Sequence, residues 1–314
     1  MLEKIDVAKQ SIKNIVIGQD QVVDLLFTAL LANGHILLES YPGLGKTKLA
    51  KSFAKVINGD FRRIQFTPDV LPSDITGIQF LNPKTHEFEL RMGPIKTNIL
   101  LADEINRATP RTQSSLLEAM EEQQITIDGI TINIPSPFLV VATQNPIESN
   151  QGTFPLPEAQ LDRFLMKINL DFPMPEQELE VLNVYQSDDP FHHIIPVLSI
   201  QEVVELQKKV TFVEVSKVVK NYLMAIIWGT RQHPEVEMGA STRAALSLMR
   251  VGQAYAFLQG RKFVTPQDIK ELAPFVLEHR IILTLDGMMR KTKHEVILEV
   301  IEQQQVPVEM EFGK

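Results

Sequence analysis

Short hydrophobic runs alternate with amphipathic segments through the first two-thirds of the chain. The runs predict buried strands at residues 36–38, 61–66, 99–102, 138–142 and 166–170. The segment 48–57 has the periodicity of a helix, and Asn58-Gly59 after it is a common helix stop. Strands that lack a polar face and alternate with helices indicate a parallel sheet covered on both sides. We therefore expect an α/β domain built on a buried parallel sheet.

Two segments interrupt this rhythm with the alternation of β-hairpins. Residues 125–134 alternate apolar and polar side chains around Asp128-Gly129, a pair that favours the type I′ turn of a two-residue hairpin loop. Residues 78–90 alternate less regularly around the turn formers at 82–85. Both hairpins are expected as insertions into the α/β domain.

Strand signals fade after residue 173, and helical patterns replace them. Helices are predicted at residues 216–230, 241–259 and 265–278. The polar, proline-bounded segment 187–196 reads as a linker. We therefore expect an α/β domain over residues 1–186 and a smaller all-helical domain over residues 187–314.

Composition and charge narrow the functional classes. Hydrophobic residues make up 44% of the 314 residues and charged residues 22%, as in an ordinary soluble globular protein. The chain has no cysteine, which excludes disulfides, thiol catalysis and cysteine-ligated metals. No apolar run has the length of a membrane span, and the N-terminus lacks the apolar core of a signal peptide, so a cytoplasmic protein without membrane insertion is expected. The formal charge of −8 disfavours stable nucleic-acid binding.

A phosphate-binding loop lies between the first strand and its helix. Residues 40–47 read SYPGLGKT, which meets the pattern G-x-x-x-x-G-K-[ST] except at Ser40. Gly43 and Gly45 allow the backbone to curl so that successive N–H groups face phosphate oxygens, and the following helix adds its positive end. Lys46 is then expected to bridge the β- and γ-phosphates, and the Thr47 hydroxyl to bind Mg²⁺.

Two carboxylates end the third predicted strand. Asp103 is placed to hold Mg²⁺ beside Thr47, and Glu104 to polarise the attacking water as a general base. Taken alone, an Asp-Glu pair after a strand is also a common start of a polar loop. The phosphate loop makes the functional reading the better one.

The two motifs together resemble those of AAA+ ATPases, and more narrowly those of the MoxR family. The resemblance extends from about residue 15 to 280 and is carried by residues 17–19, 42–47, 101–107, 142–146, 156–164 and 239–244. It implies a three-layer αβα domain with a parallel five-stranded sheet of order 5-1-4-3-2 and a helical lid. It also makes 78–90 the helix-2 insert and 125–134 the pre-sensor-1 hairpin. Ser40, where the family usually has Gly, and Thr242, where Pro is common, depart from the pattern without removing a catalytic group.

The resemblance gives catalytic roles to two further residues of the first domain. Asn145 matches sensor 1, which places the attacking water, although an Asn before Pro146 is by itself an ordinary turn former. Arg163 matches the arginine finger, which reaches the nucleotide of a neighbouring subunit. Without the resemblance, the better interpretation of Arg163 is a partner of Asp162 or Glu158 on a helix face.

The resemblance also assigns residues to the lid and to the nucleotide. Arg243 matches sensor 2, in the first turn of a helix, where the dipole disfavours a cation and an anionic partner is to be expected. Val16 and Ile17 would line the base, although this segment also reads as an ordinary loop before a helix. The expected nucleotide-binding residues are Val16, Ile17, Gly18, Gln19, Pro42, Gly43, Leu44, Gly45, Lys46, Thr47, Lys48 and Asp103.

The function expected from these residues is Mg²⁺-dependent hydrolysis of ATP to ADP and phosphate. The resemblance implies a ring, by family a hexamer, that remodels or matures partner proteins, with von Willebrand A-domain proteins as common partners. Two alternatives stay open: a nucleic-acid-dependent motor or loader, and a nucleotide-gated assembly scaffold. A DNA-tracking hairpin needs basic residues, whereas residues 125–134 contain none. Glu104 argues against a scaffold without turnover.

Overall fold

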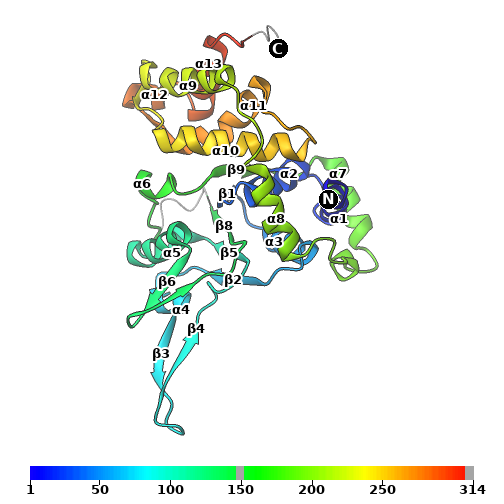
Figure 1. The fold of residues 1–314 in the computed structure, drawn as a ribbon, viewed down its shortest axis with the longest axis vertical. Coiled ribbons are helices and arrows are strands. Elements are labelled where there is room, and N and C mark those ends of the chain that lie inside the picture. Colours follow the sequence, from blue (N-terminus) through cyan, green and yellow to red (C-terminus); the bar gives the residue numbers. More distant parts are fainter. Residues whose placement is uncertain (146–151, 308–314) are drawn as a thin grey trace. The chain divides into compact units, whose positions relative to one another are not determined.

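The computed structural model describes residues 1–145 and 152–307, and the chain forms two compact units (Figure 1). The first unit comprises residues 1–164 and 168–206. The second comprises residues 165–167 and the chain from Gln207 onward. In the described part of the chain, every helix is too short or too polar to cross a lipid bilayer.

A five-stranded sheet forms the centre of the first unit. Its strands lie at the five predicted positions and are β1 (Ile36–Ser40), β2 (Phe61–Gln65), β5 (Ile99–Asp103), β8 (Leu139–Gln144) and β9 (Met166–Leu170). Their spatial order is β2-β5-β8-β1-β9, and the β2–β5, β5–β8 and β8–β1 ladders are parallel. Numbered among themselves, these strands have the order 5-1-4-3-2, which confirms the predicted fold class.

Helices cover the sheet because its central strands, β1, β5 and β8, are buried on both faces. Leu37 and Val140 pack with Leu116 of α5 (Pro110–Glu122) in one core cluster. On α2 (Asp20–Leu31) and α3 (Lys46–Val56), the rings of Phe27 and Phe53 meet edge to face at 4.9 Å. The other helices of this unit are α1 (Leu2–Lys13), α4 (Pro72–Thr76), α6 (Glu158–Leu161), α7 (Pro175–Tyr185) and most of α8 (Ile200–Val210), with short 3₁₀ turns at Ile105–Arg107 and Pro190–His193.

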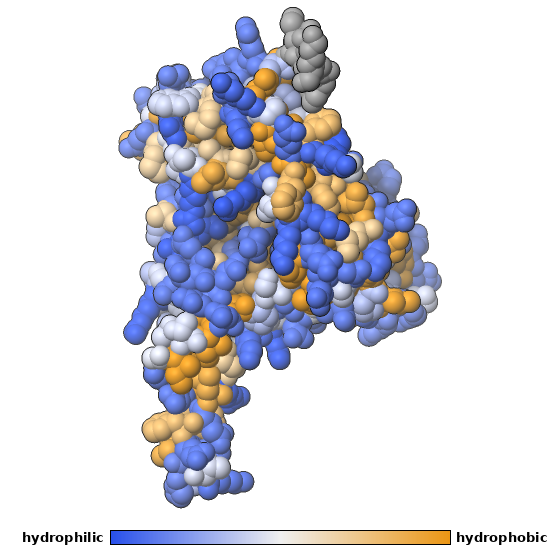
Figure 2. Space-filling view, viewed as in Figure 1, coloured by the Kyte–Doolittle hydropathy of each residue, from blue (hydrophilic) through white to orange (hydrophobic). Residues whose placement is uncertain are grey.

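Two hairpins lie where the sequence predicts them. Strands β6 (Gln124–Ile127) and β7 (Ile130–Asn133) pair in antiparallel register, and Asp128 and Gly129 both have positive φ angles, as a type I′ turn requires. Strands β3 (Gly77–Leu81) and β4 (Phe88–Met92) form a longer hairpin that projects from the rest of this unit (Figure 1). Figure 2 shows hydrophobic residues gathered along it, and its exposed apolar side chains are Ile78, Phe80, Leu81 and Phe88.

The segment 187–206, which the sequence places in the helical domain, belongs to the first unit. The backbone N–H groups of Val197 and Leu198 both donate to the carbonyl oxygen of Val56, at 2.9 and 3.0 Å. The ammonium of Lys55 also lies over the ring of Phe191, 4.7 Å from its centroid. These contacts fasten the segment to α3. The compact units therefore divide at Leu206, later in the chain than composition indicates.

The second unit is helical, as expected, with a small sheet that the sequence did not reveal. Its helices are α9 (Lys217–Gln232), α10 (Thr242–Leu258), α11 (Pro266–Leu277), α12 (Leu285–Arg290) and α13 (Lys293–Gln303), with a 3₁₀ turn at Glu278–Arg280. Strands β10 (Val236–Met238) and β11 (Ile282–Leu283) form an antiparallel ladder too short to give a periodic signal. Gly260, at φ +74°, follows α10 and ends it, and its N–H donates to the carbonyl oxygen of Phe257.

Candidate nucleotide-binding site

The loop between β1 and α3 forms an open cradle. Gly43 and Gly45 have φ angles of +87° and +75°, which a side chain would disfavour. A Cβ on either glycine would meet no atom within 4 Å, so both face open space. Lys46 begins α3, and its ammonium donates to the carbonyl oxygen of Tyr41 at 3.4 Å. Ser40 is buried at the end of β1 and has no positive φ, so its side chain does not strain the turn.

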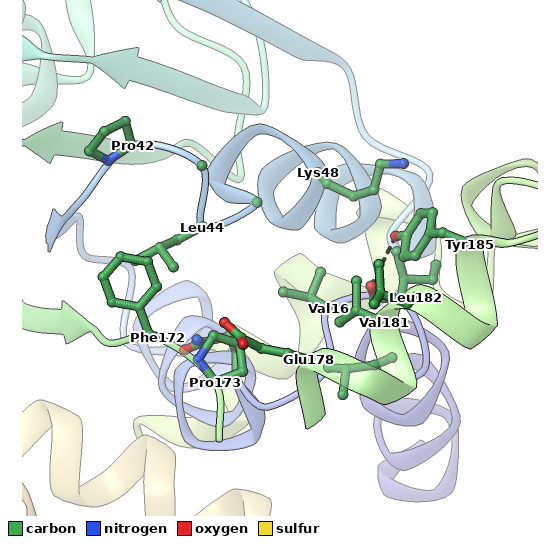
Figure 3. A pocket seen from close by; sticks show the side chains of 15 residues that line it. Val16, Pro42, Leu44, Lys48, Phe172, Pro173, Glu178, Val181, Leu182 and Tyr185 are labelled. Atoms are coloured by element: carbon green, nitrogen blue, oxygen red, sulfur yellow. Dashed lines mark hydrogen bonds between the residues drawn. The ribbon is translucent and has the colours of Figure 1, made fainter. Parts of the chain in front are cut away.

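An apolar cavity of about 620 Å³ lies beside this loop (Figure 3). Its apolar side chains come from the segment before α2, from the loop itself and from α7 and the residues preceding it: Ile15, Val16, Ile17, Pro42, Leu44, Phe172, Pro173, Val181 and Leu182. A cavity of this size and character accommodates a purine base with its ribose. Gln19 also lines the cavity, while Gly18 lies at φ +80° against Gln177 of α7.

Tyr185, the last residue of α7, is fastened beside this cavity by a hydrogen bond and a cation–π contact. The hydroxyl of Tyr185 donates to the carbonyl oxygen of Ile15 at 3.0 Å, and burial raises the pKa of Tyr185 (Figure 3). The ammonium of Lys48 lies 4.7 Å from the centroid of the Tyr185 ring and pairs with Asp189. Lys48 therefore connects the helix after the phosphate loop to the far wall of the cavity.

A second cavity, of about 450 Å³, adjoins the first and shares residues 42–45 and Lys48 with it. Its charged side chains are Lys46, Lys48, Lys51, Arg63, Asp103 and Glu104. Cations outnumber carboxylates, and the N-terminus of α3 adds a positive dipole end, so this cavity favours a polyphosphate. The structure brings the predicted loop and the predicted acidic pair into one cavity.

Asp103 is held by two neighbouring strands. It is 6% exposed at the end of β5. Its Oδ1 accepts a hydrogen bond of 2.7 Å from the Thr143 hydroxyl of β8. Its Oδ2 accepts from Nη2 and Nε of Arg63 on β2, at 2.7 and 3.2 Å. The carboxylate therefore has a fixed orientation at the carboxyl edge of the sheet, where parallel α/β sheets bind ligands.

Glu104 follows in the left-handed backbone region, at φ +59°. Its backbone N–H donates to the Thr143 hydroxyl oxygen at 2.9 Å. Its Oε2 accepts from Nε2 of Gln65 at 2.9 Å and pairs with Nε of Arg107 at 3.1 Å. This conformation turns the side chain of Glu104 into the same cavity as Asp103.

The oxygen donors in this cavity fit a magnesium ion. Thr47 and Asp103 both line it, and hydroxyl and carboxylate oxygens are ligands that Mg²⁺ prefers. Asn145 is buried directly after β8, at the same edge of the sheet. Pro146, the next residue of that motif, lies outside the described residues.

Arg163 has different contacts from those expected within its own chain. Its Nη1 donates to the carbonyl oxygen of Leu117 at 2.9 Å and pairs with Glu121 at 3.2 Å, both near the end of α5. In the described part of the chain, the residues that line the two cavities do not include it. Arg243 lies exposed in the first turn of α10, in the second unit. The roles of both arginines stay predictions.

The sequence analysis missed several polar residues of the site, among them Arg63, Gln65 and Thr143. Arg63 and Gln65 alternate on β2 and so point to the same side as Asp103 and Glu104, but this requires knowing that β2 pairs with β5. Thr143 interrupts the apolar run of β8, a buried hydroxyl that needed a partner. That interruption was the one signal available from sequence.

Comparisons with known proteins agree with this geometry. Residues 35–166 match the "ATPase family associated with various cellular activities (AAA)", and residues 229–300 match the "AAA lid domain". The chain is 47% identical over 303 residues to "Uncharacterized protein YeaC" of Bacillus subtilis, covering 96% of this chain and 94% of that protein. It is 42% identical over 296 residues to "Chaperone MoxR1" of Mycobacterium tuberculosis, covering 91% and 78%.

A more distant relative and a solved structure are also similar to this chain. "Protein MoxR" of Methylorubrum extorquens is 28% identical over 313 residues, covering 91% of this chain and 89% of that protein. The crystal structure of a "putative ATPase" from Cytophaga hutchinsonii superposes with a TM-score of 0.91 at 38% identity, covering 98% of this chain and 96% of that one. The phosphate loop, the acidic pair and the full-length similarity to MoxR relatives lead to one assignment: this chain belongs to the MoxR family of AAA+ ATPases.

Proposed function

We propose that this protein is a Mg²⁺-dependent ATPase that hydrolyses ATP to ADP and phosphate. The observation that carries the proposal is the meeting of an open phosphate cradle, Asp103 and Glu104 in one cavity, next to an apolar cavity of the size of a nucleoside. A base in the first cavity would place its phosphates in the second, because the two share the loop residues 42–45.

The chemistry proposed for the site follows from the side chains in the second cavity. Lys46 exchanges its bond to the Tyr41 carbonyl for the β- and γ-phosphate oxygens. Glu104 accepts a proton from the attacking water, and Asn145 orients that water. Thr47 and Asp103 hold Mg²⁺, which supplies positive charge against the phosphate oxygens.

We further propose that the active form is a ring, by family resemblance a hexamer. Arg163 would then act on the nucleotide of the neighbouring subunit. In agreement with this role, Arg163 contacts Leu117 of α5, and among the described residues it is not one of those that line the two cavities. Arg243 would contact the γ-phosphate as sensor 2 and report hydrolysis to the lid. Loss of the γ-phosphate would change both contacts and thereby the packing of subunits.

The proposed role of this activity is the remodelling or maturation of partner proteins. A relative is named a chaperone, and the projecting β3–β4 hairpin exposes four large apolar side chains, as protein-binding surfaces do. The MoxR resemblance makes von Willebrand A-domain proteins the first partners to test. The proposal places the protein in the cytoplasm, where ATP is supplied.

Release of phosphate from ATP tests the proposal directly. We expect wild-type protein with Mg²⁺ to release phosphate steadily, and excess EDTA to stop the release. Lys46→Ala is the matched variant, because it removes the phosphate-binding ammonium while leaving the acidic pair in place. Equal phosphate release by wild type and Lys46→Ala would contradict the proposal.

The charge of the β6–β7 hairpin argues against a nucleic-acid motor. Its turn carries Asp128, and residues 124–133 contain no lysine or arginine. A salt-titrated DNA-binding measurement separates the two functions, since a motor would bind at low salt with a steep salt dependence. We expect no salt-dependent binding in the micromolar range.

A further inference from the structure

The carboxylate expected to hold the metal is already in contact with a cation of the protein. Arg63 donates to Oδ2 of Asp103 through both Nη2 and Nε, at 2.7 and 3.2 Å. The other oxygen, Oδ1, accepts from the fully buried Thr143 hydroxyl at 2.7 Å. Oδ2 is therefore the oxygen that is shared between Arg63 and any cation in the second cavity, which both residues line.

The two partners of this ion pair differ in their freedom to move. The side chain of Asp103 is 8% exposed and fixed by Thr143, whereas that of Arg63 is 44% exposed. Arg63 also donates to Oε1 of Gln65, the neighbour that in turn bonds Glu104. If the pair opens, Arg63 is the partner that moves, because it keeps a second acceptor and contact with solvent.

The charges give this movement a direction. A guanidinium and a divalent cation on the same carboxylate oxygen repel each other, so Arg63 opposes a metal that arrives alone. A nucleotide brings phosphate oxygens into the same cavity and offers the displaced guanidinium a new anionic neighbour. When metal and nucleotide bind together, the metal neutralises Asp103 and the phosphates neutralise the displaced Arg63.

We propose that Arg63 is a displaceable counter-ion of Asp103: its guanidinium neutralises the carboxylate until Mg²⁺ and nucleotide bind together, and then moves to the phosphate side of the cavity. The inference rests on the proposed nucleotide binding of this site. It makes Arg63 a positioning residue that couples metal binding to nucleotide binding, because the pair also keeps Asp103 from repelling the phosphates of a metal-free nucleotide.

The test uses the dissociation constant of a fluorescent non-hydrolysable ATP analogue. The quantity compared is the constant measured in EDTA divided by the constant measured in saturating Mg²⁺. In Arg63→Gln, Asp103 loses its counter-ion, so binding in EDTA weakens by more than binding with Mg²⁺, where the metal neutralises the carboxylate instead. We expect the ratio to rise about three- to tenfold over wild type, the scale of a partly exposed charge pair acting on a dication. If Arg63 only bound phosphate, or only supported the fold, its replacement would weaken binding under both conditions by the same factor and leave the ratio unchanged.

Arg62→Gln is the matched control. It removes the same charge from the neighbouring position of β2, which is exposed on the opposite face of the sheet. Its ratio should equal that of wild type. Arg63→Lys keeps a positive charge beside the buried carboxylate, so it is the variant to use if Arg63→Gln does not fold. Because one ammonium replaces two guanidinium donors, its ratio should rise by less than that of Arg63→Gln.

The outcomes separate the inference from the function beneath it. Analogue binding to wild type with an unchanged ratio in both Arg63 variants would overturn the counter-ion role and leave the proposed function intact. Absence of analogue binding to wild type, in EDTA and in Mg²⁺ alike, would overturn both. A raised ratio in the Arg63 variants alone supports the inference.

Discussion

The Thr143 hydroxyl donates a 2.7 Å hydrogen bond to Oδ1 of Asp103 and thereby connects the end of β8 to the end of β5. The Thr143 hydroxyl oxygen also accepts a hydrogen bond from the backbone N–H of Glu104 at 2.9 Å. One buried side chain on β8 thus orients both residues of the acidic pair. Asn145, the predicted sensor, lies two residues further along the chain.

Replacement of Thr143 by valine should separate this orientation from simple packing. Valine has nearly the same shape, so Thr143→Val removes two hydrogen bonds and leaves a buried carboxylate oxygen and a buried N–H without that partner. We expect a loss of about 1–3 kcal/mol in the free energy of unfolding, measured with urea. Thr143→Ser keeps the hydroxyl and should retain most of the hydrogen-bond contribution; equal stability of the valine variant and wild type would contradict this role.

Glu104→Gln should keep nucleotide binding and lose turnover. The amide retains the shape of the side chain but cannot accept a proton from water, so phosphate release should fall by about 10²- to 10⁴-fold. Phosphate release and analogue binding are measured on the same samples. Glu122→Gln, at the exposed end of α5, is the charge-matched control and should behave as wild type. Turnover near the wild-type rate in Glu104→Gln would remove the general-base assignment.

Arg163→Ala should spare nucleotide binding and lower hydrolysis, by as much as about 10³-fold if the residue acts as an arginine finger. The change also removes the 3.2 Å ion pair between Arg163 and Glu121 on α5. A mixing experiment tests action between subunits, because Arg163→Ala retains Lys46 and Lys46→Ala retains Arg163. Two inactive variants should recover phosphate release when mixed in equal amounts. No recovery, with ring formation verified by sedimentation, would argue that Arg163 does not act across an interface.

The buried side chain of His35 should make stability depend on pH. Its Nε2 lies 3.1 Å from the Met120 carbonyl oxygen, its Nδ1 accepts the Val140 N–H, and burial lowers its pKa from 6.5 to about 4. Below pH 6.5 the unfolded chain takes up a proton that the folded chain refuses until about pH 4. This difference should lower the free energy of unfolding by about 2 kcal/mol between pH 7.5 and 5.

Denaturant titrations at several pH values measure this effect. The His35→Gln variant lacks the titrating ring, so the slope of its unfolding free energy against pH should be smaller even if the variant is less stable at every pH. An identical slope in wild type and variant would assign the pH dependence to other groups.

The sequence predicted the central sheet and the loop because both depend on local patterns. Five short segments indicated strands, three of them uniformly apolar (36–38, 99–102 and 138–142), and Asp128-Gly129 indicated a hairpin through the two positive φ angles that its turn needs. The phosphate loop led us to expect Asp103 beside Thr47 as a Mg²⁺ ligand, and both residues line the second cavity.

The contacts that the sequence analysis missed are those made across the sheet or between distant segments. Arg63 meets Asp103 only because β2 lies beside β5, and Arg163 meets Glu121 only because α6 is followed by a turn towards α5. The segment 187–196 is polar and proline-bounded, yet Val197 and Leu198 directly after it bind the end of α3 through backbone atoms that carry no sequence signal. Each of these contacts depends on tertiary structure.

The central claim is that the cradle of Gly43 to Thr47 and the carboxylate of Asp103 together bind Mg²⁺ and ATP. A crystal structure with a non-hydrolysable ATP analogue and Mn²⁺, located by its anomalous signal, tests it most directly. The phosphates should lie against the loop, and the metal between the Thr47 hydroxyl and Asp103. An analogue bound elsewhere, or a metal away from both residues, would contradict it.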